Sequence, residues 1–238
     1  MKKIYQKSEL FFTIIWIIAY VVLMSVADSV SSNLGIDKVI TAPLSIAMAL
    51  FLVIWIKNNG LSSKYGLVGA EYNQKTFLCF IPIYLMISVN FWGGINLNFN
   101  LFEGILFIIS MIAVGVIEEI IFRGFLFKVL QKDNLTVAII VSSLTFGIGH
   151  IVNLLNGAEL VSTLLQIVYA SSAGFLFTVI FYKTGSLFLC IATHSIVNAT
   201  SLFHISDFTL DIVTAIVLTI TSIAYAFWIL RCEKNKKN

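Results

Sequence analysis

Residues 102–121 read FEGILFIISMIAVGVIEEII, a run of twenty residues in which only Glu103, Glu118 and Glu119 carry charge. A continuous apolar run of this length spans the ~30 Å hydrocarbon core of a bilayer as an α-helix. A membrane β-strand would be shorter and would alternate between apolar and polar positions. Because a backbone in lipid must satisfy its own hydrogen bonds, the run predicts a transmembrane helix.

Seven similar runs accompany this one. The 238-residue chain is 59% hydrophobic and 11% charged, with a mean hydropathy of +0.97, which is too apolar for a soluble domain of this size. We therefore expect an all-α, polytopic transmembrane bundle that forms a single domain over residues 1–238. The eight predicted spans are Leu10–Ala27, Val39–Ile56, Thr76–Gly94, Phe102–Ile121, Leu135–Leu155, Leu160–Tyr182, Ser186–Phe203 and Phe208–Ile229.

Charged residues between the spans predict the orientation of the chain. Cytoplasmic loops carry an excess of Lys and Arg, and here these residues fall in alternate connections, with Lys38 as the exception. Both termini are therefore expected in the cytoplasm. The basic set is Lys2, Lys3, Lys7, Lys57, Lys64, Lys75, Arg123, Lys128, Lys132, Lys183, Arg231, Lys234, Lys236 and Lys237; the acidic set on the other side is Asp28, Asp37, Glu103, Glu159, Asp207 and Asp211.

The fourth span ends in two adjacent carboxylates and an arginine, Glu118, Glu119 and Arg123. Acidic residues within a span are costly, so they usually face a bundle interior or a water-filled cavity and mark function. Glu119 and Arg123 are four residues apart and can pair on one helix face. Glu118 points away from that pair, so it is freer to handle a proton. The alternative interpretation is a snorkelling ion pair at a helix end.

His150 ends the segment Phe146-Gly147-Ile148-Gly149-His150 in the fifth span. The two glycines would let another backbone or a substrate approach closely. At 1.5 Å per residue, His150 lies about 22 Å from Leu135, deeper than Glu118 unless Leu135 to about Val141 runs through the interface. A single histidine here could also serve only as a hydrogen bond between helices.

His194 and Asn198 are four residues apart in the seventh span, so an imidazole and an amide share one helix face. They could bind an oxyanion or hold a substrate carbonyl, or they could form hydrogen bonds between helices. Together the three spans supply groups suited to the roles of base, donor and charge stabiliser. We therefore predict an active site of Glu118, Glu119, Arg123, His150, His194 and Asn198.

Other polar and sulfur-bearing residues suit structural roles. Cys79, Cys190 and Cys232 fit neither a disulfide framework nor a Cys-x-x-Cys metal site. Ser195 points about 100° away from its neighbour His194 on a helix, which disfavours a serine mechanism. His204 lies near Asp207 at the outer end of its span and is expected to be interfacial.

The motifs Glu118-Glu119-x-x-x-Arg123, Phe146-x-x-x-His150 and His194-x-x-x-Asn198 resemble those of the CAAX-protease and bacteriocin-processing (CPBP) family of intramembrane endopeptidases. The resemblance covers about Gly115 to Ser201, within a catalytic core that we expect over residues 103–203. It implies that Glu118 and His150 activate a water, that Glu119 and Arg123 support them, and that His194 and Asn198 stabilise the tetrahedral oxyanion.

The resemblance also bears on cofactors and partners. No His-Glu-x-x-His motif is present, so a divalent metal such as zinc would have to use Glu118, His150 and His194. We favour a glutamate-activated water that needs no cofactor. The expected partners are membrane lipid and a peptide or lipidated-protein substrate, and the net charge of +3 requires no nucleic-acid partner.

The family's roles are the processing of prenylated proteins and, in bacteria, peptide maturation or bacteriocin self-immunity. The Ile-, Asn- and Lys-rich composition and the small size favour a bacterial plasma-membrane protein. We expect a water-accessible pocket that opens toward the cytoplasm or laterally to lipid. The alternatives are a catalytically silent peptide-binding immunity protein and a proton-coupled transporter, which would favour broken helices and internal repeats.

Overall fold

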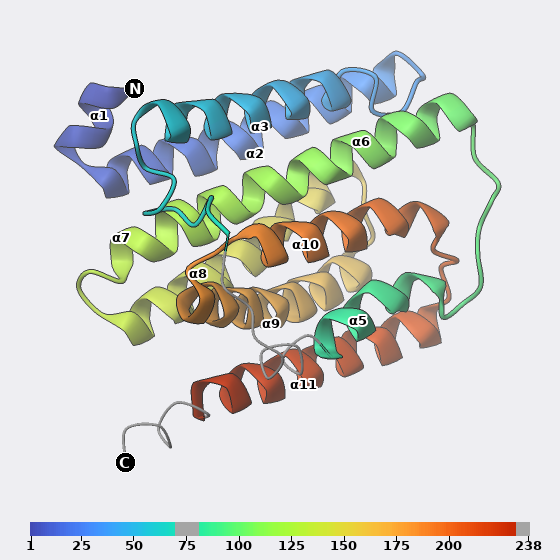
Figure 1. Ribbon diagram of the computed structural model, residues 1–238. Coiled ribbons are helices and arrows are strands. Elements are labelled where there is room, and N and C mark those ends of the chain that lie inside the picture. Colours follow the sequence, from blue (N-terminus) through green and yellow to red (C-terminus); the bar gives the residue numbers. More distant parts are fainter. Residues whose placement is uncertain (70–80, 232–238) are drawn as a thin grey trace.

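The computed structural model describes residues 1–69 and 81–231, and every regular element in these ranges is helical. The expected all-α, polytopic helical bundle is confirmed (Figure 1). The elements are α1 (Lys2–Lys7), α2 (Glu9–Asn33), α3 (Thr41–Asn58), α5 (Ile81–Ser88), η2 (Val89–Phe91), α6 (Leu101–Glu118), η3 (Glu119–Phe127), α7 (Lys128–Leu130), α8 (Leu135–Gly149), η4 (His150–Asn156), α9 (Leu160–Thr184), α10 (Phe188–Thr200), η5 (Ser201–Phe203) and α11 (Phe208–Arg231).

Short polar side chains mark where several helices begin. The Ser8 hydroxyl accepts from the Phe11 N–H at 3.1 Å at the start of α2, and Asn100 accepts from the Phe102 N–H at 2.8 Å at the start of α6. Asn134 caps α8 in the same way. These caps satisfy backbone donors that the first turn of a helix leaves free, so they fix where each apolar run becomes helical.

Within residues 1–69 and 81–231, six helical segments are long and apolar enough to cross a membrane: Glu9–Asn33, Thr41–Asn58, Leu101–Leu130, Leu135–Asn156, Leu160–Thr184 and Phe208–Arg231. Two predicted spans are shorter helices, Pro82–Phe91 and Phe188–Phe203. The first of these begins next to residues 70–80, so the N-terminal part of the predicted Thr76–Gly94 span lies outside the described residues. The chain is a multi-pass membrane protein.

Helix α6 lies at the centre of the bundle. It packs against α3 on one side and against α10 on the other, while α9 packs against both α8 and α11 (Figure 1). Gly115 makes the close contact with α10 possible, because a Cβ there would lie 2.9 Å from the backbone nitrogen of Ser195. The continuation of α6 beyond Glu118 is therefore surrounded by helices.

Charged side chains divide the bundle into two ends. We call the end that holds Lys57, Lys64 and Lys132 the basic end, and the N-terminus and the end of α11 lie there too (Figure 1). The acidic end holds Asp28, at the far end of α2, with Asp37, Glu103, Glu159, Asp207 and Asp211. Lys38, the exception to the sequence pattern, forms a 2.8 Å ion pair with Asp28.

Candidate active site

The two adjacent carboxylates lie where α6 changes its winding. Glu118 is the last α-helical residue, and Glu119 begins the π-helical segment η3, all nine residues of which are buried. Hydrogen bonds in a π-helix run from residue i to residue i+5, and such segments occur frequently at functional sites. The wider turn distributes bulky and charged side chains within the core of the bundle.

Arg123 and Glu119 form the ion pair that their spacing predicts. The Arg123 Nη1 and Glu119 Oε1 atoms are 3.0 Å apart, and both side chains are 0% exposed. The guanidinium also lies over the Phe146 ring, 4.1 Å from its centroid. A Cβ on Gly174 would lie 3.0 Å from Arg123 Nη2, so this glycine gives α9 room for the guanidinium. The pair is fully buried in the bundle, whereas the alternative interpretation expected an ion pair that reaches the membrane surface.

His194 joins the two carboxylates. Its Nδ1 atom is 2.9 Å from Glu119 Oε1, and its Nε2 atom is 3.3 Å from Glu118 Oε2. Its ring also packs edge-on against Phe146, at 5.5 Å between centroids. Helix α10 therefore brings both imidazole nitrogens against carboxylates, a contact that the sequence spacing does not reveal.

Tyr20 is a site residue that the sequence analysis missed. Its hydroxyl donates a 2.6 Å hydrogen bond to Glu118 Oε1, from α2 and 98 residues away along the chain. A tyrosine in the middle of an otherwise apolar span was the available signal, because a buried phenol usually finds a hydrogen-bond partner.

A cavity of about 350 Å³ lies against this cluster and is lined by Glu118, His150, His194 and Asn198. Among the described residues, the side chains of His150 and Asn198 have no hydrogen-bond partner. His150 directly follows the last residue of α8, and its side chain lines the same cavity as Glu118 and His194. The cavity continues toward the acidic end, whereas the sequence analysis expected a cytoplasmic or lateral opening.

The two glycines before His150 do different things. A Cβ on Gly147 would lie 2.7 Å from the Ser171 nitrogen and 2.8 Å from the Ile167 carbonyl oxygen, so Gly147 permits the close approach of α9. Gly149 has no atom within 4 Å of such a Cβ and lines the cavity instead. One glycine therefore serves packing, and the other leaves space beside the site.

Several buried polar atoms at the site have no hydrogen-bond partner among the described residues. They are Glu118 Oε2, Glu119 Oε2 and the three guanidinium nitrogens of Arg123, although the ion pair compensates the charge of the guanidinium. Native proteins satisfy most buried polar groups, and exceptions point to a catalytic role or to water or a ligand. Glu118 lines the cavity and the other residues lie behind it, so this cluster is a candidate functional site.

Metal ligation has limited support from side-chain placement. In residues 1–69 and 81–231, no three His, Cys, Asp or Glu side chains are grouped so that they could hold a metal ion. Among these described residues, Glu118 and His194 approach each other, and His150 lines the same cavity without an ion pair to either of them. The sequence-derived metal set is therefore not assembled in this conformation.

The structural interpretations of three other residues agree with their contacts. Ser195 donates a 3.0 Å hydrogen bond to the Ile112 carbonyl oxygen and packs against α6. Cys190 is a buried free thiol, while Cys79 and Cys232 lie outside the described residues. The His204 Nε2 atom is 2.9 Å from Asp211 Oδ1 at the acidic end.

Comparison with known families identifies the segment that carries this site. Residues 100–200 match the family model of Type II CAAX prenyl endopeptidase Rce1-like proteins. Over this segment the chain is similar to an Rce1-like domain. The resemblance to the CAAX-protease and bacteriocin-processing family is thereby confirmed over this segment. Searches of curated proteins and of solved structures gave no match.

The matched segment contains the predicted site residues from Glu118 to Asn198, whereas Tyr20 lies outside it. Similarity to this family supports a protease acting at the membrane, as a class of activity. A membrane-associated peptide or protein is the corresponding class of substrate.

Proposed function

We propose that this protein is an intramembrane endopeptidase that hydrolyses a peptide bond of a membrane-associated peptide or protein. The observation that carries the proposal is the buried Glu118 carboxylate, which Tyr20 holds and His194 faces at the wall of a cavity. His150 and Asn198 line the same cavity, and their side chains have no hydrogen-bond partner among the described residues. A general base needs a fixed carboxylate beside space for water and substrate.

Charge balance suggests where a proton resides in the resting site. Glu118 and Glu119 would together carry two negative charges, and Arg123 supplies one positive charge. A net charge buried among helices is costly. One proton on His194 Nε2, which lies 3.3 Å from Glu118 Oε2, would make the cluster neutral and leave the Glu118 carboxylate able to accept a proton.

In the proposed reaction, Glu118 removes a proton from a water molecule while the water oxygen bonds to the carbonyl carbon of the substrate. Collapse of the tetrahedral intermediate breaks the carbon–nitrogen bond, and the proton passes to the leaving amine. The products are a new carboxyl terminus and a new amino terminus. His150 lines the same cavity and can assist the water, as the family resemblance implies.

The geometry changes which residue we assign to stabilising the oxyanion. Both nitrogens of His194 face carboxylates, so this residue is better suited to positioning Glu118 than to binding the oxyanion alone. The free Asn198 amide, four residues along the same helix and in the same cavity, is the donor that we assign to the oxyanion. Removing one such donor typically costs about 10²–10³-fold in kcat.

We propose that the glutamate-activated water needs no obligatory metal. If a divalent ion did bind, Glu118, His150 and His194 would be its ligands, and it would polarise the substrate carbonyl. The test is activity after prolonged chelation and metal analysis. Retained activity supports the proposal, whereas loss of activity that zinc restores would overturn it.

The function is tested by comparing purified wild-type protein with Glu118→Gln and His150→Ala on a lipid-reconstituted peptide library, with new termini identified by mass spectrometry. Loss of a general base should reduce cleavage by about 10²–10⁴-fold. Glu159→Gln is the matched control, because Glu159 is exposed and its side chain caps no helix. Absence of cleavage by every protein, with equal peptide binding, would favour the silent binding module instead.

The biological setting follows from the same features. We propose a bacterial plasma-membrane protein with cytoplasmic termini, in which residues 103–203 form the catalytic core. Peptide maturation or self-immunity is the role that we favour over the processing of prenylated proteins. An immunity function that survived Glu118→Gln would show that peptide binding, and not turnover, is what protects the cell.

A further inference from the structure

The cavity extends from Glu118 toward only one end of the bundle. From Glu118 it follows α2 past Ser25 to Asp28 and reaches Lys38 in the following connection. It also reaches Asn156, which is exposed at the end of η4. All these residues lie on the acidic side of Glu118 along their helices. The cavity therefore connects the candidate site with the acidic end of the bundle.

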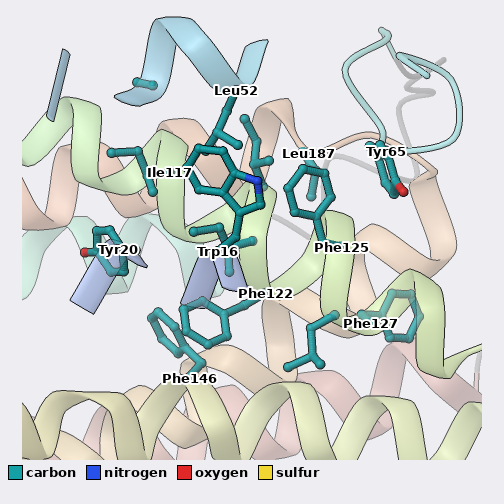
Figure 2. Packing of buried hydrophobic residues seen from close by; sticks show 14 of the residues in the cluster. Trp16, Tyr20, Leu52, Tyr65, Ile117, Phe122, Phe125, Phe127, Phe146 and Leu187 are labelled. Carbon is teal, nitrogen blue, oxygen red and sulfur yellow. The ribbon is translucent and has the colours of Figure 1, made fainter. Parts of the chain in front are cut away.

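On the opposite side of Glu118 the lining consists of aromatic rings. Phe122, Phe146 and Phe177 are the lining residues nearest the basic end. Phe122 and Phe146 pack edge-on at 5.4 Å between centroids, and Figure 2 shows the two rings together beneath the buried cluster. The rings form the floor of the cavity.

Beyond this floor the basic end is closed by further packing. Phe125 contacts Phe12 at 5.4 Å and Tyr65 at 4.9 Å between ring centroids, and Figure 2 shows Phe125 beside Tyr65. Glu9 is 2.7 Å from the Lys64 ammonium and 2.9 Å from that of Lys132. These ion pairs join the start of α2 to the segment after α3, which holds Lys64, and to the connection between α7 and α8, which holds Lys132.

The distribution of charge indicates which face of the membrane each end meets. The described Lys and Arg residues outside the spans lie at the basic end, except Lys38, which forms an ion pair with Asp28 at the acidic end. Basic loops are retained on the cytoplasmic side. The acidic end, and with it the part of the cavity at Asp28, Lys38 and Asn156, therefore faces the outer side of the membrane.

The walls of the cavity suit a polypeptide backbone. They combine apolar side chains with neutral amides, and several amide groups are already fixed: Asn153 Nδ2 donates to Gln166 Oε1 at 2.8 Å, and Asn90 Nδ2 donates to the Val197 carbonyl oxygen at 2.7 Å. Amide groups offer both donors and acceptors without charge, as an extended peptide requires. The amides that line the cavity are Asn90, Asn153, Asn156, Asn198 and Gln166.

We propose that the substrate is a peptide segment that reaches Glu118 from the outer face of the membrane, through the cavity mouth at Asp28, Lys38 and Asn156. This inference rests on the proposed peptidase function, which it narrows to exported peptides or outward-facing segments of membrane proteins. A lipidated protein on the cytoplasmic surface would meet the closed basic end.

Cysteine labelling tests the route without requiring catalysis. In a background with Cys79, Cys190 and Cys232 replaced by serine, we would introduce Asn156→Cys at the mouth or Ser25→Cys within the cavity. The matched control is Asn58→Cys, exposed at the basic end of α3. Each variant is treated with a membrane-impermeant maleimide in spheroplasts and in inverted vesicles, after gel filtration and thermal unfolding have shown that it folds.

We expect Asn156→Cys and Ser25→Cys to be labelled in spheroplasts, and Asn58→Cys to be labelled only in inverted vesicles. The reverse pattern would overturn the proposal, as would a folded Ser25→Cys variant that reacts only from the cytoplasmic side or from neither side. Peptides found to be cleaved should be cut when added to spheroplasts and spared in sealed inverted vesicles. Failure of all cleavage with the expected labelling would refute the peptidase function and leave the access route standing.

Discussion

Arg123 shows how strongly one residue constrains the site. Its guanidinium is fully buried, lies against the Phe146 ring and has Glu119 as its ion-pair partner. Glu119 in turn holds His194 through Nδ1. Because these contacts form a chain, Arg123 fixes the imidazole that faces Glu118 without itself lining the cavity.

Replacing Arg123 with Gln should therefore destabilise the protein. It leaves the Glu119 carboxylate buried without its counter-charge, a change that typically costs about 3–5 kcal/mol. The double variant Glu119→Gln with Arg123→Gln should lose less stability than Arg123→Gln alone, because no unpaired charge remains. Thermal unfolding of the three proteins in one detergent measures the effect, and equal losses in single and double variants would contradict this account.

For individual residues, the sequence indicated the candidate site residues more fully than the contacts that those residues make. The four-residue spacing predicted the pair of Glu119 with Arg123 because both lie on one helix. The bridge from His194 to both carboxylates and the hydrogen bond from Tyr20 depend on how α2, α6 and α10 pack, and no local spacing encodes that. The catalytic roles of all these residues stay predictions.

Among the elements, α8 and α9 show how close packing positions a reactive side chain. Gly147 lies against Ser171, whose hydroxyl donates a 2.7 Å hydrogen bond to the Ile167 carbonyl oxygen on its own helix. His150 follows one turn later at the end of α8. The distance between the two helices therefore determines where the imidazole enters the cavity.

Gly147→Ala and Gly149→Ala form a matched pair in one helix. The new methyl of Gly147→Ala would meet the α9 backbone, so we expect a loss of about 1–3 kcal/mol in the free energy of unfolding, the usual cost of overpacking. Gly149→Ala places its methyl in open space and should leave stability nearly unchanged. Denaturant titration with the same detergent compares them; equal stabilities would show that the helices can separate freely.

Element boundaries were predictable where apolar runs and caps agree. Six of the eight runs correspond to long helices, and Asn100 and Asn134 mark two of the starts. The change to π winding at Glu119 was not predictable, because hydrophobic periodicity is hardly altered by one wider turn. The run that begins at Thr76 extends into residues outside the described chain.

For the whole molecule, the closed basic end depends on contacts between distant segments. The Lys64 ammonium donates to Glu9 and to the Tyr5 hydroxyl, each at 2.7 Å. Burial by itself lowers the pKa of Lys64, but these hydrogen bonds outweigh it and hold the pKa above the ordinary value of 10.5. Folding thus favours the protonated amine.

This shift predicts how stability depends on pH. A raised pKa in the folded state contributes stability that is complete below pH 10.5 and is lost as the pH rises through the folded-state value. Wild-type protein should therefore lose more of its thermal stability above about pH 10 than Lys64→Met does. Lys57→Met, at an exposed position of the same end, should follow the wild-type curve; parallel curves for all three proteins would argue against the contact.

The whole-molecule properties that follow from composition were predictable, and the shape of the cavity was not. Apolar runs and alternating charged loops predicted a helical bundle with a basic end and an acidic end. The direction of the cavity depends on which side of Glu118 is filled by aromatic rings. That packing involves contacts between residues far apart in the sequence, such as Phe12 and Phe125.

The aromatic floor beneath Glu118 also matters for the energy balance of a cell. Water in a cavity that is open on one side shortens the apolar distance that separates the two compartments. A glutamate that accepts protons at the closed end of the cavity could then pass protons across the membrane. The rings of Phe122, Phe146 and Phe125 carry no hydrogen-bonding groups, so they interrupt a hydrogen-bonded path for protons from Glu118 toward the basic end. Hydrolysis within the bilayer is thereby compatible with a membrane that keeps its electrochemical gradient.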